Sequence, residues 1–216
     1  MKVAPTLVRP NAATLETRSG RAERAAARRT AILEAALDEF SARGFASARL
    51  DDVAQRAGVA KGTIYLHFKD KEALFQELVR TMLGPLVVGL EQLRASDLPI
   101  RTVLERFADL FVHDIYGTRR RDVARLVITE GTRFPELAEF YYREVVARGI
   151  GAMRAMIKRA VARGELRHEA LARFPQLVVA PGLVAILWAG LFDRFDHLDV
   201  VEMMRAHIDI LLERRE

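Results

Sequence analysis

The segment 50–74, LDDVAQRAGVAKGTIYLHFKDKEAL, constrains the fold of this chain more than any other stretch. Gly58 separates an apolar repeat at helical spacing from a second short helix expected over residues 61–68, which buries Ile64 and Phe68 one turn apart. The repeat before the glycine consists of Leu50, Val53, Ala54 and Ala57. Two short helices joined by a tight turn predict a helix-turn-helix, whose second helix is suited to the DNA major groove.

The distribution of charge agrees with a nucleic-acid partner. The chain carries a formal net charge of +5; residues 1–71 hold 13 basic and 8 acidic residues, whereas residues 72–216 hold 21 of each. All the excess positive charge therefore lies in the part that contains the helix-turn-helix, as phosphate binding requires. An ordinary solvated surface is the alternative that the charge alone leaves open.

The stretch AGVAKGTIYLHFKDKEAL resembles the DNA-binding signature of the TetR family of bacterial transcriptional regulators. The run RRTAILEAALDEFSARGF before it resembles the first helix of that family and the turn after it, so the resemblance covers residues 28–78. It implies an N-terminal DNA-binding domain, a homodimer on a palindromic operator, and a C-terminal domain that binds a small effector. The segment RLVITEGTRFPELAEFYY is weakly similar to regulators of drug efflux and suggests a lipophilic effector.

Candidate DNA-contacting residues surround the second short helix. Phosphate contacts are expected from basic residues at helix starts, and base contacts from the exposed face of the helix. Thr63 and Leu66 suit thymine methyl groups, and Gly62 permits close approach of the duplex. In the family pattern, Tyr65 and His67 contact the backbone and nearby bases; packing and capping is the alternative for His67. The full set is Arg49, Lys61, Gly62, Thr63, Tyr65, Leu66, His67 and Lys71.

One position departs from the family pattern. Ala48 stands where the family often has a threonine that caps the next helix and touches phosphate, and Ala60 stands where a serine is frequent. Alanine does neither through its side chain, so Ser47 is expected to take the cap or Arg49 to compensate electrostatically.

Helical periodicity continues to the end of the chain, with no strand alternation and no internal repeat. We therefore expect an all-α fold of about nine helices in three parts. These are a disordered basic arm over 1–22, a helix-turn-helix domain of three helices over 23–70, and a helical ligand-binding and dimerisation domain over 71–216. The first helix is expected to begin near residue 22 or 25, and Gly44 to end it. Asp70 is expected to cap a further helix, which Gly84 and Pro85 should kink or interrupt. The last two helices are expected over residues 168–195 and 200–212.

The C-terminal part predicts a dimer interface and an effector pocket. The run VVAPGLVAILWAGLF is apolar nearly all round, which favours a helix at a subunit interface, although burial within one subunit is the alternative. The interface candidates are Val178, Gly182, Ala185, Ala189, Met204, Ile208 and Leu211. The pocket candidates, each of which could equally be a core or surface residue, are Phe107, Phe111, Tyr116, Arg125, Glu130, Phe134, Tyr141 and Trp188.

Other classes of function find less support. The chain lacks a Gly-rich phosphate loop, a Gly-x-Ser-x-Gly elbow and a His-Glu-x-x-His motif, so we expect no enzyme, cofactor or metal. The cluster Asp193, Asp196, His197 and Asp199 is expected to form a polar turn, with metal binding as the alternative. A DNA-binding protein without ligand response and an activator also stay open. The absence of cysteine and of an apolar leader suits the cytoplasm, and the uncharged stretch 174–192 is expected inside the protein rather than in a membrane.

Overall fold

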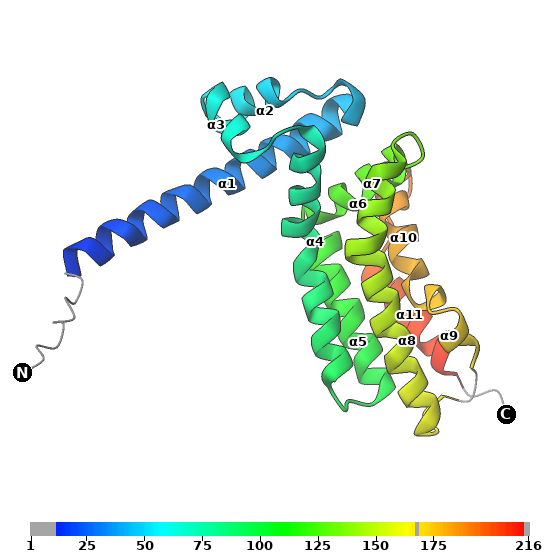
Figure 1. The fold of residues 1–216 in the computed structure, drawn as a ribbon. Helices are drawn as coiled ribbons and strands as arrows, with labels where there is room; N and C mark the ends of the chain where they lie inside the picture. Colours follow the sequence, from blue (N-terminus) through cyan, green and yellow to red (C-terminus); the bar gives the residue numbers. More distant parts are fainter. Residues whose placement is uncertain (1–11, 167–168, 214–216) are drawn as a thin grey trace, which may run out of the picture.

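The computed structural model describes residues 12–166 and 169–213, with side chains from residue 23 onward. Every regular element in these residues is helical, and the segments join into ten continuous helices, which confirms the predicted all-α class. A long first helix projects from a small N-terminal unit, and a bundle of upright helices lies below that unit (Figure 1).

The N-terminal unit consists of α1 (Ala12–Ser47), α2 (Leu50–Arg56) and α3 (Lys61–His67). The expected start of the first helix was wrong, because α1 begins at Ala12, ten residues before residue 22. Residues 12–30 are rich in alanine and arginine, which extend a helix that packing has already nucleated further along the chain. Residues 1–11 of the predicted disordered arm lie outside the described residues.

Gly44 ends the regular part of α1 as expected. Its φ of 71° and ψ of 164° are non-helical, and the positive φ is a conformation that favours glycine. The turn places Phe45 in the core, where its ring centroid lies 5.4 Å from that of Phe40 and 5.9 Å from that of Phe75. This aromatic cluster holds the base of the helix-turn-helix against α4 (Lys71–Ala95).

Helix α4 connects the two parts of the molecule. Its N-cap is Asp70, whose carboxylate accepts a 2.7 Å hydrogen bond from the amide of Ala73, as the sequence predicted. The helix continues without interruption through Gly84 and Pro85, where a kink or an interruption was expected. By length and composition α4 is the one helix in the described residues that could cross a membrane, and its apolar side is buried in the bundle.

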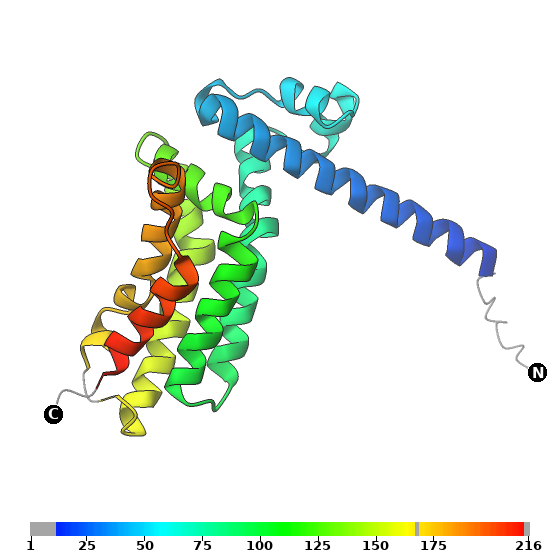
Figure 2. The same ribbon diagram turned by 180° about the vertical axis from the view of Figure 1, so that it is seen from behind.

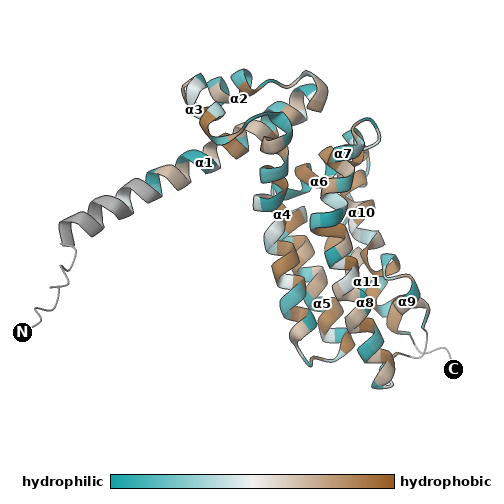
Figure 3. Ribbon diagram, viewed as in Figure 1, coloured by the Kyte–Doolittle hydropathy of each residue, from teal (hydrophilic) through white to brown (hydrophobic). Residues whose placement is uncertain are grey.

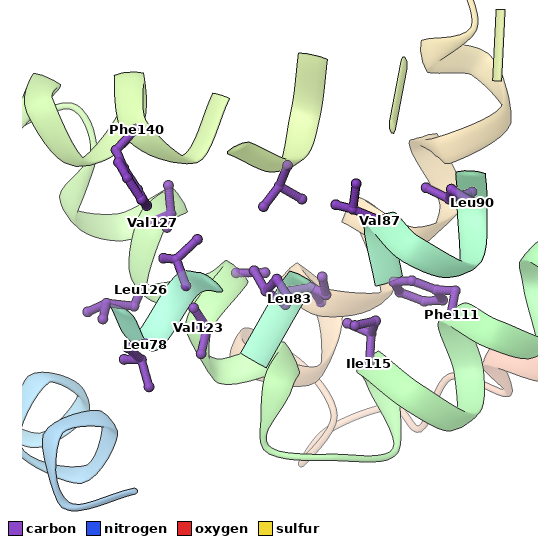
Figure 4. Packing of buried hydrophobic residues seen from close by; sticks show 14 of the residues in the cluster. Leu78, Leu83, Val87, Leu90, Phe111, Ile115, Val123, Leu126, Val127 and Phe140 are labelled. Carbon is purple, nitrogen blue, oxygen red and sulfur yellow. The ribbon is translucent and has the colours of Figure 1, made fainter. Parts of the chain in front are cut away.

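The bundle contains the remaining helices, two of which include a π-helical segment. In chain order they are α5 (Ile100–Leu110) with η1 (Phe111–Tyr116), α6 (Arg120–Glu130), α7 (Pro135–Tyr141) with η2 (Tyr142–Val146) and α8 (Ala147–Ala162), α9 (Ala170–Arg173), α10 (Gln176–Leu191) and α11 (Val200–Leu212). Hydrophobic and hydrophilic residues alternate around these helices (Figure 3), and their apolar sides meet in one continuous core (Figure 4).

The single helix expected over residues 168–195 is divided into α9 and α10. Phe174 has φ −123° and ψ 67°, because the ring of Pro175 disfavours a helical conformation in the residue before it. Pro175 and the residues after it then start α10. Helices α10 and α11 lie next to each other on the side of the bundle away from the projecting part of α1 (Figure 2).

Candidate DNA-reading surface and interior cavity

Helix α3 presents one face to solvent and one to the core. Ile64 and Phe68 are buried in the core, and α3 packs against α2, which fixes the orientation of the helix. On the opposite face Leu66 is 85% exposed and Tyr65 is 48% exposed. Of the remaining predicted contacts on this helix, Thr63 is half-buried and Lys61, Gly62 and His67 are exposed. The structure therefore gathers these predicted residues on a single short helix that is free on its outer side.

A carboxylate of α2 holds two of these side chains. The ammonium group of Lys61 donates to Oδ2 of Asp51 at 2.7 Å, and the hydroxyl of Tyr65 donates to Oδ1 of the same residue at 3.2 Å. The hydrogen bond from Lys61 lowers the pKa of Asp51, and the same bond raises the pKa of Lys61. Sequence reasoning missed Asp51, since it lies ten residues before its partner and only the packing of α2 on α3 brings the two together.

A second charged cluster fixes α2 on α1. Glu39 is buried and receives contacts of 3.1 Å from the guanidinium groups of both Arg43 and Arg56. Arg43 also contacts Asp52 on α2 at 3.2 Å. A buried carboxylate is stable only when it is paired, so this cluster holds α1 and α2 in one arrangement.

Lys71 has a structural contact besides its predicted role. Its Nζ donates to the carbonyl oxygens of Phe45 and Ala46 at 2.8 and 2.7 Å, and lies 4.8 Å from the centroid of the Phe45 ring. An ammonium group has three donors, so one is left for a phosphate. Lys71 lies in the same surface depression as Arg49 and Tyr65, beside the start of α2.

The start of α2 shows the effect of the missing threonine. Arg49 is the N-cap residue and is exposed, but no side chain caps the helix, so the expected cap from Ser47 is not formed. Ala48 is buried under the turn. Asp51 and Asp52 in the first turn complement the helix dipole instead.

The bundle contains an apolar cavity of about 180 Å³ that is partly open to solvent. Side chains from α4 and the helices around it line the cavity; Figure 4 shows several of them, among them Leu83, Leu90, Phe111 and Ile115. The sequence placed Phe107, Phe111 and Tyr141 there, and all three do line it. The lining residues that it missed are Leu83, Leu86, Leu90, Ile115, Ala124, Val145, Val146, Gly149, Ile150, Met153, Val179, Gly182, Leu183, Ile186 and Met204.

Both π-helical segments border this cavity. Segment η1 contributes Phe111 and Ile115, and η2 contributes Val145 and Val146. A π-helical turn widens a helix locally and occurs preferentially at functional sites. Its presence on two neighbouring helices around one cavity indicates that the space is a built feature of the bundle.

Five of the predicted pocket residues do not line the cavity. The ring of Tyr116 is tilted against that of Phe111 outside the cavity, with centroids 6.4 Å apart, and Arg125 pairs with Asp122 at 3.3 Å. Trp188 donates its indole N–H to the carbonyl of Asp196 at 2.7 Å. These predictions were wrong because an aromatic or charged residue on a bundle helix can face either inward or outward, and the spacing of single residues does not distinguish the two.

Glu130 and Phe134, the other two, lie at the junction between the two parts of the molecule. The ring of Phe134 packs against Phe45 with centroids 5.0 Å apart, and a Cβ atom built on Gly44 would meet Oε1 of Glu130 at 3.0 Å. Arg119, just before α6, forms an ion pair with Asp38 of α1. Helix α6, which lines the cavity through Ala124, is thereby packed directly on the DNA-reading unit.

Helix α10 has one apolar face inside the subunit and another in solvent. The predicted interface residues face inward: Val178, Gly182, Ala185, Met204 and Ile208 are buried in the single subunit, and Ala189 and Leu211 are half-buried. Gly182 was predicted to permit a close approach, and it does so toward Phe111, because a Cβ atom built on it would meet the ring of Phe111 at 3.0 Å. The exposed apolar residues of α10 and α11 are Leu177, Leu183, Val184, Leu187, Leu191, Val201 and Ile210.

The acidic cluster between α10 and α11 forms a polar turn. Asp199 is the N-cap of α11 and accepts a 2.9 Å hydrogen bond from the amide of Glu202. His197 contacts Asp193 at 2.9 Å, and the described residues include no group of three side chains placed to hold a metal ion.

These features define a helix-turn-helix DNA-binding protein with a separate helical domain. A family model described as "Bacterial regulatory proteins, tetR family" matches residues 32–78, and one described as "AefR-like transcriptional repressor, C-terminal domain" matches residues 102–193. The chain belongs to the TetR family and is a transcriptional regulator.

Relatives and solved structures agree with this assignment. The HTH-type transcriptional repressor KstR2 of Rhodococcus jostii is 30% identical over 155 residues, which are 68% of this chain and 74% of the relative. PfmR from Thermus thermophilus has a TM-score of 0.68 at 24% identity over 86% of this chain and 95% of that one. FadR from Bacillus subtilis, solved in complex with stearoyl-CoA, has a TM-score of 0.66 at 19% identity over 85% of this chain and 97% of that one.

Proposed function

We propose that this regulator is a repressor, which binds a palindromic operator as a homodimer and leaves it when a small lipophilic molecule enters the interior cavity. The observation that carries the proposal is the course of α4. This one helix is capped at Asp70, directly after the recognition helix, and further along lines the cavity with Leu83, Leu86 and Leu90. A ligand in the cavity and DNA on α3 therefore act on the same rigid element.

The energetic logic is that of linked equilibria. A ligand that binds more tightly to a conformer with wrongly spaced recognition helices lowers operator affinity by its differential binding free energy. Helix α6 gives the second connection, because it borders the cavity at Ala124 and reaches α1 through the Arg119–Asp38 ion pair and the Phe134–Phe45 contact. A ligand that changes the distance between α4 and α6 would therefore change the orientation of α3.

The exposed apolar residues of α10 and α11 support the dimer. Val184, Leu187 and Leu191 recur at spacings of three and four, so they form a stripe on the solvent side of α10. A contiguous apolar surface on a soluble protein marks an interaction site, and a two-fold pairing of two helices from each subunit makes a four-helix bundle. Such a dimer presents two copies of α3 to a palindromic site.

The relatives support the same function. KstR2 is named as a repressor, and the FadR structure contains a lipid-derived ligand, which agrees with the apolar lining of the cavity here. Transcriptional control of this type takes place in the cytoplasm, where we place the protein.

Fluorescence anisotropy tests DNA binding directly. We would titrate the protein into a labelled duplex taken from the DNA beside its own coding sequence, at two salt concentrations. Tight binding with a steep salt dependence, together with its loss in Tyr65→Ala, is the expected result. A protein that prefers this duplex no more than random DNA, or a Tyr65→Ala variant that binds equally well, contradicts the proposal.

A further inference from the structure

Tyr141 stands apart from the other residues that line the interior cavity. It is the one lining residue whose side chain has an oxygen or nitrogen atom; the others are aliphatic, aromatic, methionine or glycine. Among the described residues, no hydrogen bond involves its hydroxyl group, although the residue packs against the core. Tyr141 is half-buried, and because no protein group pairs with its hydroxyl, that hydroxyl is available to a molecule in the cavity.

The hydroxyl is also held in its neutral form. Burial alone raises the pKa of Tyr141 above its ordinary value of 10.0, so the group stays protonated at physiological pH. A neutral phenol donates one hydrogen bond and accepts others, and its partner can be either a donor or an acceptor.

We propose that the cavity binds an uncharged apolar molecule about the size of a substituted benzene, whose single polar group forms a hydrogen bond with the Tyr141 hydroxyl. This inference rests on the proposed function and specifies the chemical class of the effector. It assigns Tyr141 as the residue that distinguishes the effector from other apolar molecules of the same size.

The volume of the cavity limits the size of the ligand. At about 180 Å³ it is slightly larger than the apolar cavity of roughly 150 Å³ that is known to admit benzene, and smaller than the pockets of roughly 300 Å³ and more that hold drug-sized molecules. A ring with a short substituent therefore fits without rearrangement of the bundle.

The absence of charge from the lining limits the electrostatics of the ligand. No lysine, arginine or histidine is among the residues around the cavity, so a carboxylate would be buried without a counter-ion. A carboxylic acid would have to bind in its protonated form. With an ordinary carboxyl pKa near 4.3, only about one molecule in 1000 is protonated at pH 7.3, so the apparent affinity falls roughly 1000-fold. The apparent affinity then rises about ten-fold for each unit by which the pH is lowered.

Isothermal titration calorimetry with three matched probes tests the proposal. The probes are 4-propylphenol, propylbenzene and 4-propylbenzoate, which share a ring and chain and differ in the polar group. Each is titrated into the wild-type protein, Tyr141→Phe and the control Tyr142→Phe. Tyr142 is the neighbouring tyrosine, is 61% exposed and does not line the cavity. Because Tyr141→Phe removes only an unpaired hydroxyl, we expect the variant to fold as well as the wild type.

The expected pattern is specific to Tyr141. Tyr141→Phe should weaken the binding of 4-propylphenol by about 3- to 10-fold, the usual effect of losing one neutral hydrogen bond. The same substitution should leave the affinity for propylbenzene unchanged or higher. Tyr142→Phe should change neither. The benzoate should bind only as the pH is lowered. The proposal would be overturned if Tyr141→Phe weakened the binding of 4-propylphenol and propylbenzene equally, or if neither probe bound the wild-type protein. It would also be overturned if the benzoate bound independently of pH, or if stearoyl-CoA bound saturably and with the same affinity in Tyr141→Phe.

The same samples separate this inference from the function on which it rests. Operator release is followed by anisotropy in the presence of each probe. A probe that binds with the expected dependence on Tyr141 but leaves the operator complex intact would contradict the proposed effector response and uphold the ligand class. A protein that is released from DNA by a charged or much larger molecule would uphold the response and overturn the ligand class.

Discussion

The ammonium nitrogen of Lys61 on α3 lies 2.7 Å from the carboxylate oxygen Oδ2 of Asp51 on α2. Both groups are exposed on the surface proposed to face DNA, and Tyr65 donates to the other oxygen of Asp51. A negative charge at this place opposes the approach of phosphate and occupies the cation that would attract it. We infer that Asp51 restrains sequence-independent binding.

Replacing Asp51 by asparagine is expected to raise affinity for random DNA several-fold. It frees Lys61 for a phosphate and removes a repulsive charge, so the slope of log affinity against log salt should become steeper by about one. Anisotropy at several salt concentrations measures both. Asp52→Asn is the control, because it removes the same charge from the same helix but its partner is Arg43. Weaker binding of Asp51→Asn to random DNA would show instead that the carboxylate positions Tyr65.

Lys71 and Lys61 are expected to differ when each is replaced by methionine. Lys71→Met should lower the free energy of unfolding by about 1–2 kcal/mol, because its ammonium group holds two carbonyl oxygens at the end of α1. Lys61→Met should leave thermal stability unchanged and weaken DNA binding, because it leaves the charge of Asp51 unpaired on the surface proposed to face DNA. Denaturant titration and anisotropy on both variants give the comparison. Equal stability of the two proteins would contradict a structural role for Lys71.

The solvent-facing stripe of α10 predicts the dimer contact. Leu187→Glu places a charge in the proposed interface and should convert the dimer to a monomer, with loss of operator affinity of about 100-fold or more, since only one recognition helix then binds. Sedimentation velocity reports the change in mass. Val88→Glu is the matched control, because Val88 is an exposed aliphatic residue of α4 outside this stripe. A Leu187→Glu protein that sediments like the Val88→Glu protein would place the interface elsewhere.

Glu165 supplies a cap that α5 lacks in its own sequence. The amide of Ile100 donates to its Oε2 at 2.5 Å, since the N-cap residue Pro99 has no side-chain acceptor. That hydrogen bond, with help from Arg163, lowers the pKa of Glu165 below its ordinary 4.5. Because the folded-state pKa is lowered, the carboxylate stabilises the fold above about pH 4.5, and the contribution is lost as the pH falls through the folded-state value.

Glu165→Gln should therefore reduce stability by about 1 kcal/mol at neutral pH, the usual effect of losing a helix cap, and by less at a pH low enough to protonate the carboxylate in the folded protein. Thermal unfolding followed by circular dichroism at both pH values measures the difference. Glu105→Gln, whose partner Arg101 lies 3.8 Å away, should have little effect at either pH. A loss from Glu165→Gln that is equally large in acid would show that the cap does not depend on charge.

Local sequence was sufficient for several parts of the structure. The segment 50–74 carries both an apolar period and a motif, so α2, α3 and the exposed face of α3 were predicted correctly. Asp70 was identified as a helix cap and Gly44 as a helix end, because each signal depends only on the backbone beside it. The last helix was also placed correctly, since Asp199 precedes a clear amphipathic pattern.

Predictions that needed the orientation of a helix were less successful. The run that forms α10 is apolar all round, so no polar residues mark which side of the helix faces solvent. The sequence therefore does not distinguish the inner stripe with Ala185 from the outer stripe with Leu187. Glu130 and Phe134 were placed in the pocket because they are polar and aromatic, yet they contact the turn at Gly44 and Phe45. The extension of α1 back to Ala12 was missed because its composition lacks apolar periodicity while favouring a helix.

The amino-acid sequence by itself determined the helical class, the helix-turn-helix and which residues of its second helix are exposed, because these depend on contacts within a few turns of one chain segment. Only the tertiary structure decided which side chains border the cavity, that Asp51 pairs with Lys61, and that α6 contacts the DNA-reading unit. These relationships join residues that lie far apart along the chain or on different helices. They arise from the way whole helices pack to bury their apolar faces together, and the pattern of one helix does not specify which neighbour its faces meet.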